Sequence, residues 1–410
     1  MKFLLSLLFF ISAVTLQAQV VNVGKKFPIK TIKQGLAVAK SGDTVKVHSG
    51  IYKEGNILID KKIVFVGIDH PTIDGEKKYE VISVKHDSVV VDGFKIIRSS
   101  SASLSEPSAI KVYAKKHILI QNNILNDNFF GIYLENCAFV IVKNNVIKAY
   151  EVEEQKIGNG VHCWKSSNIQ VIGNTIIGHR DGVYFEFVSE SIVWRNISDH
   201  NKRYGLHFMF SNSNSYITNI FRNNGAGVAV MYSKRVKMFN NIFEKNRGNG
   251  TYGLLLKDIS DSYMFNNKFI DNTIAIYSEG SIRIKIEKNE FLNNGWAFKI
   301  QANSMDNEIV NNNFKGNTFD MATNGTLVMN TFDSNYWDKY EGYDLNKDGI
   351  GDVPYHPLSL FAVLVESTPS TMLLYRSFMI TLLDKSEKVL PSITPDNFID
   401  NSPLMKSLPL

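Results

Sequence analysis

Short runs of alternating apolar and polar residues return at a regular spacing between about Ile118 and Phe314. Successive runs begin 29, 22, 23, 22, 26, 22 and 22 residues apart, which makes 22 residues the basic period. Their small opening residues are Gly131, Gly160, Gly182, Gly205, Gly227, Gly253, Ala275 and Ala297. Eight residues before five of these lies an Asn: Asn123, Asn174, Asn219, Asn267 and Asn289. A period of this length predicts stacked units that cannot bury their apolar faces alone.

The repeating unit reads as short strands. The runs are three to five residues long, rich in β-branched and aromatic residues, and separated by Asn and Gly. Leucine-rich repeats have similar periods, but no Leu framework recurs here and no run has helical spacing. The pattern therefore predicts an all-β chain, a right-handed, single-stranded parallel β-helix over residues 19–334 with about ten coils. Asn at a turn tolerates left-handed backbone angles, and its amide can bond to the next Asn along the stack.

The two ends of the predicted solenoid differ from its middle. Residues 31–40 carry apolar residues at helical spacing, which predicts a short helix that caps the first coil. The period is lost after Asn330; residues 335–355 form an Asp- and Gly-rich segment, and residues 356–410 a non-repeating tail. Within this tail, apolar residues from about Met372 to Leu383 predict a helix.

Strand alternation sorts the repeat positions into columns that run along the solenoid. Positions one and three after the small residue are apolar and should point inward, so positions two and four should point outward. His207 and Met209 then share the outer face of one strand, and Met231 lies one coil away from Met209. Two thioethers and an imidazole favour copper, Cu(I) above all, because these are soft ligands. The alternatives are an exposed apolar patch that docks a protein, or Met residues under a loop.

A second candidate metal site follows the repeats. Oxygen-bearing residues alternate in the segment from 344 to 352, with Gly349 at the sixth position, which is the layout of a calcium loop. The predicted ligands are Asp344, Asn346, Asp348, the Ile350 carbonyl and Asp352. Tyr355 occupies the twelfth position, where an EF-hand has its bidentate Glu. We expect a structural Ca2+ site, with an ion-free Asp/Gly turn as the alternative.

The first residues indicate export. Lys2, an uncharged run from Phe3 to Leu16 and the small Ala18 are typical of a secretory signal peptide over residues 1–18; a retained anchor is the alternative. We expect the two cysteines, Cys137 and Cys163, to be buried free thiols, because their repeat positions do not stack. A net charge of +5 with interspersed signs gives no basic stripe, which argues against nucleic-acid binding.

Several stretches together resemble the NosD family of periplasmic β-helix proteins, which have carbohydrate-binding and sugar-hydrolase-like repeats. The most specific stretches are Arg203-Tyr-Gly-Leu-His-Phe-Met-Phe-Ser-Asn and Val230-Met-Tyr-Ser, joined to the non-repeating tail. Further matches are Ala39-Lys-Ser-Gly-Asp-Thr, Tyr252-Gly-Leu-Leu-Leu, Asn335-Tyr-Trp-Asp through Asp348-Gly-Ile-Gly-Asp-Val-Pro-Tyr, and Asp400-Asn-Ser-Pro-Leu-Met-Lys. The tail departs from the family pattern at Phe378, where a Pro is expected.

The resemblance implies a periplasmic, non-enzymatic protein that supplies copper to nitrous oxide reductase. Its implied partners are an ABC-type inner-membrane complex (NosF/NosY-like), a copper-chaperone lipoprotein (NosL-like) and the reductase. By this resemblance His207, Met209 and Met231 are candidate copper ligands, and the tail from His356 is the dock for the transporter. An exported polysaccharide-binding or lyase-type β-helix is the competing hypothesis, with Tyr133, Trp164, Tyr184 and Tyr277 as a fragment of an aromatic track. A structural scaffold of a membrane complex is the third.

Overall fold

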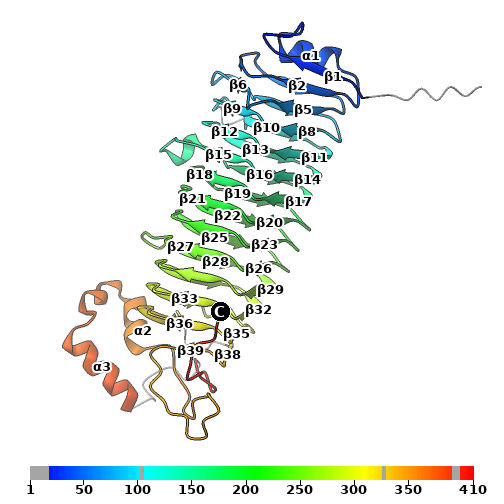
Figure 1. The fold of residues 1–410 in the computed structure, drawn as a ribbon. Coiled ribbons are helices and arrows are strands. Elements are labelled where there is room, and N and C mark those ends of the chain that lie inside the picture. The colour runs from blue at the N-terminus through cyan, green and yellow to red at the C-terminus, as the bar shows by residue number, and fades with distance from the viewer. Residues whose placement is uncertain (1–17, 102–105, 326–328, 390–397) are drawn as a thin grey trace, which may run out of the picture.

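The computed structural model describes residues 18–101, 106–325, 329–389 and 398–410. All but the last residue of the expected signal peptide lies outside these ranges. The described chain forms a parallel β-helix whose coils stack along one axis, with α1 (Ile32–Val38) at one end and α2 (Leu360–Ser367) and α3 (Phe378–Val389) at the other (Figure 1). The predicted fold class is confirmed.

Among the described residues, most coils contribute one strand to each of three parallel sheets, and the terminal coils contribute fewer. Sheet A contains β1 Val20–Val23, β2 Thr44–Val47, β5 Val64–Gly67, β8 Val90–Asp92, β11 Lys116–Gln121, β14 Ala138–Lys143, β17 Ser167–Ile172, β20 Ile192–Trp194, β23 Ser215–Ile217, β26 Lys237–Phe239, β29 Ser260–Phe265, β32 Ile282–Glu287, β35 Glu308–Val310 and β38 Thr331–Asp333. Sheet B contains β3 Ile51–Tyr52, β6 Thr72–Asp74, β9 Lys95–Ile97, β12 Ile124–Asn126, β15 Val146–Lys148, β18 Thr175–Ile177, β21 Ile197–Asp199, β24 Ile220–Arg222, β27 Ile242–Glu244, β30 Lys268–Ile270, β33 Glu290–Leu292, β36 Asn313–Lys315 and β39 Tyr336–Trp337. Sheet C contains β4 Ile57–Ile59, β7 Ile82–Val84, β10 Ser108–Tyr113, β13 Phe130–Glu135, β16 Val161–Trp164, β19 Val183–Glu186, β22 Tyr204–Met209, β25 Ala226–Met231, β28 Tyr252–Lys257, β31 Ile274–Glu279, β34 Trp296–Ile300 and β37 Phe319–Ala322.

The solenoid covers the predicted residues but has more coils than the sequence pattern indicated. Sheet A alone has 14 strands, against the expected ten or so coils. The additional coils lie mainly before Ser108, where the strands follow one another without the paired Asn and Gly of the regular repeats. Their stacking depends on the apolar residues that they turn inward, such as Phe65 and Phe94, whose rings lie 4.2 Å apart.

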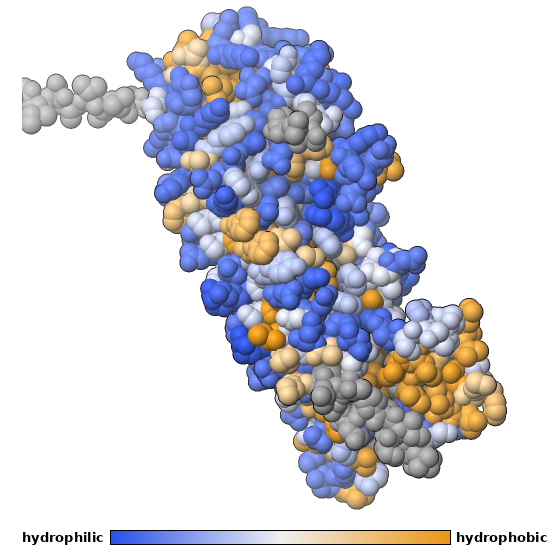
Figure 2. Space-filling view, turned by 180° about the vertical axis from the view of Figure 1, so that it is seen from behind, coloured by the Kyte–Doolittle hydropathy of each residue, from blue (hydrophilic) through white to orange (hydrophobic). Residues whose placement is uncertain are grey.

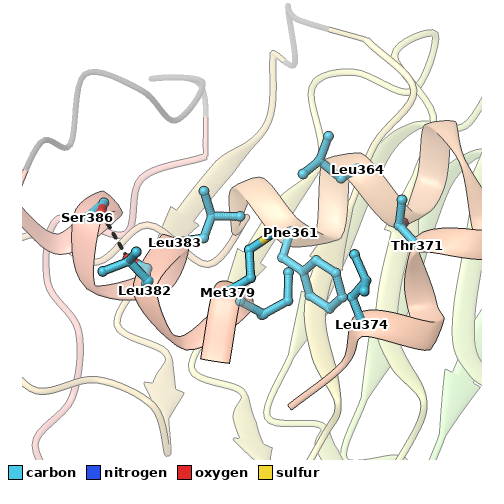
Figure 3. Close-up of a pocket in the computed structure, with 9 residues that line it drawn as sticks. Phe361, Leu364, Thr371, Leu374, Met379, Leu382, Leu383 and Ser386 are labelled. Carbon is cyan, nitrogen blue, oxygen red and sulfur yellow. Dashed lines mark hydrogen bonds between the residues drawn. The ribbon is translucent and has the colours of Figure 1, made fainter. Parts of the chain in front are cut away.

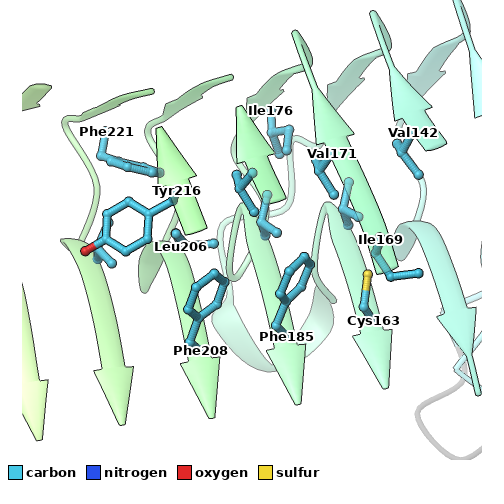
Figure 4. Close-up of a cluster of buried hydrophobic side chains, with 14 of the residues drawn as sticks. Val142, Cys163, Ile169, Val171, Ile176, Phe185, Leu206, Phe208, Tyr216 and Phe221 are labelled. Carbon is cyan, nitrogen blue, oxygen red and sulfur yellow. The ribbon is translucent and has the colours of Figure 1, made fainter. Parts of the chain in front are cut away.

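The core is a column of side chains enclosed by the three sheets. Positions one and three after the small residue are buried throughout the regular coils, as the alternation predicted. Figure 4 shows this interior, with Phe185 and Phe208 stacked from neighbouring strands of sheet C and Tyr216 and Phe221 opposite them. Cys137 and Cys163 are buried free thiols, which confirms the prediction.

A ladder of asparagine side chains joins the coils at the turn between sheets A and B. In the middle of the ladder, Asn219 Oδ1 accepts hydrogen bonds from the backbone N–H and the Nδ2 of Asn196, both at 2.9–3.0 Å. Asn219 Nδ2 in turn donates to Asn241 Oδ1 at 3.0 Å. The members are Asn123, Asn145, Asn174, Asn196, Asn219, Asn241, Asn267, Asn289, Asn312 and Asn335, all buried. The amides therefore satisfy backbone groups that the tight turn removes from water.

A second ladder follows the turn between sheets B and C. From Asn201 to Asn317 the amides again bond along the stack, and Asn201 Oδ1 accepts from the backbone N–H of His179. His179 thus occupies a ladder position in this turn and is fully buried. The coil of His179 keeps the geometry of this turn, and the imidazole takes the place that an asparagine amide has in the other coils. Burial lowers the pKa of His179 to about 4.

Both ends of the stack are covered. Thr31 caps α1 by accepting a hydrogen bond from the Gln34 backbone N–H, and the buried Ile32 and Leu36 lie over the first coil. At the other end Asp400 takes the place of the next ladder residue, because its Oδ2 accepts from the backbone N–H and the Nδ2 of Asn335. The predicted capping helix is confirmed, and the C-terminal segment proves to be a second cap.

The first asparagine ladder should carry a measurable share of the stability. Asn219→Leu leaves the buried donors of Asn196 without their acceptor, and we expect the free energy of unfolding to fall by roughly 2–4 kcal/mol. Urea unfolding followed by circular dichroism measures the loss. The exposed Asn240, whose backbone angle φ of 55° suits glycine, provides the control: Asn240→Gly should change stability by less than about 0.5 kcal/mol. Equal losses in both variants would contradict the ladder's role.

Buried histidines should make the fold sensitive to acid. The pKa of His179 in the folded state, about 4, lies below its unfolded value, so the unfolded chain binds more protons between these two pH values. Stability is therefore retained above pH 6.5 and lost as the pH falls toward 4, by up to about 1.4 kcal/mol per pH unit. His179→Asn, which restores a ladder amide, should flatten this slope by one proton, whereas the exposed His117→Asn should not. Urea midpoints at several pH values check the slope.

Candidate metal-binding face

The predicted copper ligands lie on two adjacent strands of sheet C. β22 and β25 are parallel, and their register pairs Met209 with Met231 and His207 with Ala229. Paired residues of neighbouring strands lie about 4.8 Å apart. The two thioethers are thus direct neighbours on the outer face, as the repeat period predicted, and both side chains are partly exposed. Glu186 and Lys257 continue this column on either side of the methionine pair.

His207 differs from the expectation of a solvent-facing ligand. It points away from the apolar core but is only 4% exposed. The rings of Tyr184 and Tyr204 lie 4.8 and 4.9 Å from its imidazole and cover it. Tyr204 lies three residues before His207, so strict alternation would not predict this contact between their rings. Strand alternation gives the direction of a side chain but not what covers it, which is why the sequence analysis placed His207 at the surface.

A buried charge pair lies beside the imidazole. Arg203 Nε donates to Asp181 Oδ1 at 2.8 Å, and Asp181 Oδ2 lies 3.5 Å from His207 Nδ1. Burial raises the pKa of Asp181, but the hydrogen bonds and charge of Arg203 together with His207 outweigh it, so the pKa is lowered. Asp181 is therefore an anion within the protein, and its charge stabilises a cation held nearby.

The free atom of the imidazole is Nε2. Nδ1 lies near Asp181 and 3.4 Å from Arg203 Nη2, whereas Nε2 is buried with no hydrogen-bond partner among the described residues. A buried polar atom without a partner is costly, and it is a feature to explain. An imidazole nitrogen left free in this way is a common metal ligand.

Asp181 and Arg203 were missed by the sequence analysis. Asp181 lies one residue before Gly182 and Arg203 lies two residues before Gly205, where the chain enters β19 and β22 of sheet C. The signal that could have revealed them is an opposite-charge pair 22 residues apart, about one coil, although the two positions differ by one within the repeat. That spacing places the two side chains in neighbouring coils.

His162 belongs to the same column as His207 but not to the same site. Tyr184 separates the two histidines, at 4.9 Å from His162 and 4.8 Å from His207. Burial lowers the pKa of His162 to about 3. The column from Tyr133 to His207 is a continuous stack of rings, and Tyr133 and His162 are buried within it.

The predicted calcium loop is exposed and held by its own side chains. Asp344 accepts from the backbone N–H groups of Lys347 and Gly349, at 2.6 and 2.9 Å. Asp348 Oδ1 accepts from the Ile350 N–H at 2.8 Å, and Asp352 Oδ2 from the Leu345 N–H at 2.6 Å. Asn346 donates to Asp348 at 3.0 Å. Across the described ranges no three His, Cys, Asp or Glu residues gather as a metal site, so calcium binding stays a prediction.

Comparison with solved structures supports the fold. The catalytic domain of a GH87 alpha-1,3-glucanase in complex with tetrasaccharides matches with a TM-score of 0.61 at 11% identity. The match covers 77% of this chain and 68% of that one. The corresponding catalytic unit from Streptomyces thermodiastaticus matches with a TM-score of 0.56 at 12% identity, over 74% of this chain and 64% of the other. At such identities the likeness concerns the fold alone.

Sequence relatives are more informative. The family model described as "Periplasmic copper-binding protein (NosD)" matches residues 147–342, a range that includes the methionine pair. A protein of Stutzerimonas stutzeri named "Probable ABC transporter binding protein NosD" is 29% identical over 382 residues, which cover 88% of this chain and 86% of that protein. A protein of the same name from Pseudomonas aeruginosa is 28% identical over 393 residues, covering 91% and 90%. The family match and both relatives agree, and they show that this chain is similar to NosD proteins over about nine-tenths of its length.

Proposed function

We propose that this protein binds Cu(I) on the outer face of sheet C and delivers it, with an ABC-type membrane complex, to nitrous oxide reductase during assembly of its copper sites. The observation that carries the proposal is the pairing of Met209 with Met231 in adjacent strands, with His207 on the same face. This pair lies within the region matched by a family described as periplasmic copper-binding.

The donor set fits Cu(I) as cargo. Thioether and imidazole ligands are soft enough to select Cu(I) over the hard cations of an exported protein's surroundings. His207 Nε2 supplies a buried nitrogen without a partner among the described residues, and the Asp181–Arg203 ion pair lies on the Nδ1 side of the ring. The partly exposed sulfurs leave one side open to an incoming protein. An ion held in this way can be shared and passed on without unfolding of the carrier.

We assign the protein a binding role and not an enzymatic one, in the periplasm. Both relatives are named as binding proteins, and the family is described as periplasmic. The competing polysaccharide track loses support from the structure, because Tyr133 is 5% exposed and Tyr184 is stacked between two histidines. Trp164 and Tyr277 are partly exposed, but four strands of sheet C lie between them, so they do not form a continuous track.

The C-terminal helices form the proposed dock for the membrane complex. Figure 2 shows that apolar surface gathers over this end of the molecule. Side chains of α2, η2 (Pro369–Leu374) and α3 point toward one another around a hollow of about 320 Å³ (Figure 3). Leu373 is 90% exposed and Phe378 83%. Contiguous exposed apolar surface of this kind is typical of an interaction site. No helix in the described ranges is long and apolar enough to cross a membrane.

The helices are fixed to the solenoid, so docking there would position the whole β-helix. Lys299 of β34 forms an ion pair with Glu366 of α2 at 2.5 Å, and the ring of Phe361 lies 5.7 Å from that of Phe319 in β37. The partners that we propose are the ABC-type inner-membrane complex, the copper-chaperone lipoprotein and nitrous oxide reductase.

Calcium is proposed as a structural ion of the loop from Asp344 to Asp352. The bonds of Asp344 and Asp348 to backbone N–H groups already hold this loop in a tight turn, which is the arrangement that an oxygen-ligand loop requires. Calorimetric titration with Ca2+ tests whether the loop binds the ion. Absence of binding heat would support the ion-free Asp/Gly turn.

Removal of the two thioethers should abolish copper binding. We expect the mature protein to hold about one Cu(I) in competition with a chromogenic chelator, because Met209 and Met231 supply two soft ligands. The double variant Met209→Ala/Met231→Ala should lose more than the roughly 10- to 100-fold in affinity that follows removal of a supporting residue.

The chain contains a matched control for that experiment. Met238 and Met264 are also register partners in adjacent strands, but both are fully buried in the core. Met238→Leu/Met264→Leu should therefore retain Cu(I) affinity. A wild type without Cu(I) affinity would contradict the copper site and leave the scaffold hypothesis.

Polar substitutions on the C-terminal helices should weaken association with the membrane complex. Leu373→Ser/Phe378→Ser removes the two most exposed apolar side chains of the tail, so folding should be retained while co-purification with the affinity-tagged ABC complex falls at least about tenfold. Val152→Ser, at a 79% exposed position in another part of the molecule, is the control. Undiminished co-purification of the tail variant would argue against the dock.

A further inference from the structure

Three aromatic residues occupy a backbone position that is unfavourable for them. The turn from sheet C to sheet A begins with a residue in the left-handed region in coil after coil. Asn136, Lys165 and Asp258 occupy it elsewhere, and the first and last are residue types that tolerate such angles. In three consecutive coils it holds Phe187, Phe210 and Tyr232, with φ of 53°, 49° and 50°. A bulky residue at such angles costs about 1–2 kcal/mol, so the backbone at this position disfavours aromatic side chains.

The three rings form one exposed ladder. Phe187 and Phe210 are stacked with centroids 5.3 Å apart and 8° between their planes, and Phe210 and Tyr232 are stacked at 5.0 Å and 17°. Their side chains are 47%, 43% and 41% exposed, in that order. We call these three residues the aromatic ladder.

The aromatic ladder adjoins the methionine pair. Phe210 directly follows Met209 in the chain, and Tyr232 directly follows Met231. The backbone N–H of Phe187 donates to the Met209 carbonyl at 3.1 Å, and that of Phe210 to the Met231 carbonyl at 3.1 Å. Any macromolecule that reaches both sulfurs from outside therefore comes against these rings.

The packing of the rings decides what can bind them. Both faces of Phe210 are occupied by its neighbours, so the ladder presents mainly ring edges to solvent. Sugars stack on ring faces, which the ladder does not offer along its length. Ring edges instead suit apolar side chains and the sulfur of methionine, which contacts aromatic edges favourably. The ladder therefore fits a protein surface that carries sulfur ligands.

We propose that the aromatic ladder of Phe187, Phe210 and Tyr232 is the docking surface for a copper-donor protein that holds Cu(I) through its own thioether or thiolate side chains. The inference rests on the proposed copper function. Docking on the ladder brings the donor's sulfur ligands beside Met209 and Met231, so that the ion is shared between the two proteins before the donor ligands leave. No change in oxidation state is required, because Cu(I) passes between neutral or anionic sulfur ligands.

The test uses the triple variant Phe187→Asn/Phe210→Asn/Tyr232→Asn. Asparagine tolerates the left-handed angles, so the turns should fold as in the wild type. The probe is the soluble domain of the copper-chaperone lipoprotein from the same organism. Binding of the copper-free probe is measured by biolayer interferometry, and copper transfer from the loaded probe by stopped-flow spectroscopy. We expect docking to weaken at least about tenfold, the scale of losing an interface hot spot, with slower transfer.

Phe139 provides the matched control. It also has a positive φ, of 54°, is 50% exposed, and stacks on His117 at 5.3 Å, but it lies in β14 of sheet A, away from the methionine pair. Phe139→Asn should dock and accept copper as the wild type does.

Cu(I) competition titration separates the two proposals. Unchanged Cu(I) affinity in the triple variant with weakened docking supports the ladder as a docking surface. Docking as tight as that of the wild type, or loss of Cu(I) affinity itself in the triple variant, would overturn it. If the wild type docks through the ladder yet binds no Cu(I), the docking surface stands and the copper function fails.

Discussion

The hydrogen bonds between buried asparagine amides of successive coils are the interaction on which this structure depends. A coil of three short strands must turn sharply three times, and each turn takes backbone N–H groups away from water. In the first ladder one Oδ1 accepts both the backbone N–H and the Nδ2 of the preceding asparagine, as Asn219 does for Asn196. The same bonds set the register of neighbouring strands. They end where Asp400, from the last segment of the chain, supplies the final acceptor.

The register of the strands brings particular residues of successive coils together and so forms the candidate site. Met209 and Met231 are neighbours because one coil of 22 residues separates them. A slip of either strand by one residue would turn its methionine into the core. Departures from the repeat then distinguish this part of the face from the rest. Asp181 and Arg203 place a buried ion pair beside His207, and aromatic residues replace turn-formers in the adjoining turns. Functional features lie where the local rules of the repeat are broken.

The two regions for which we propose functions lie at different positions along the solenoid axis. The strands β28, β31, β34 and β37 lie between the methionine pair and the C-terminal helices in sheet C. The two regions that we propose for copper binding and for docking are therefore separate, and a partner at one leaves the other free. The rigid stack holds them at a constant separation, because each coil is bonded to the next over its whole circumference.

The sequence by itself determined the fold class, the inward columns, the N-terminal cap and the pairing of the two methionines. These follow from period and alternation, which relate each residue to its neighbours one coil away. The tertiary structure decided that His207 and His179 are buried, that Asp181 meets Arg203, and that Asp400 ends the ladder. It also showed α2 and how many coils precede Ser108, where the predicted β-helix lacks the regular repeat. A pattern along the chain gives the direction of a side chain, but burial and charge pairing depend on which other side chains fold over it, and only the packed coils supply those neighbours.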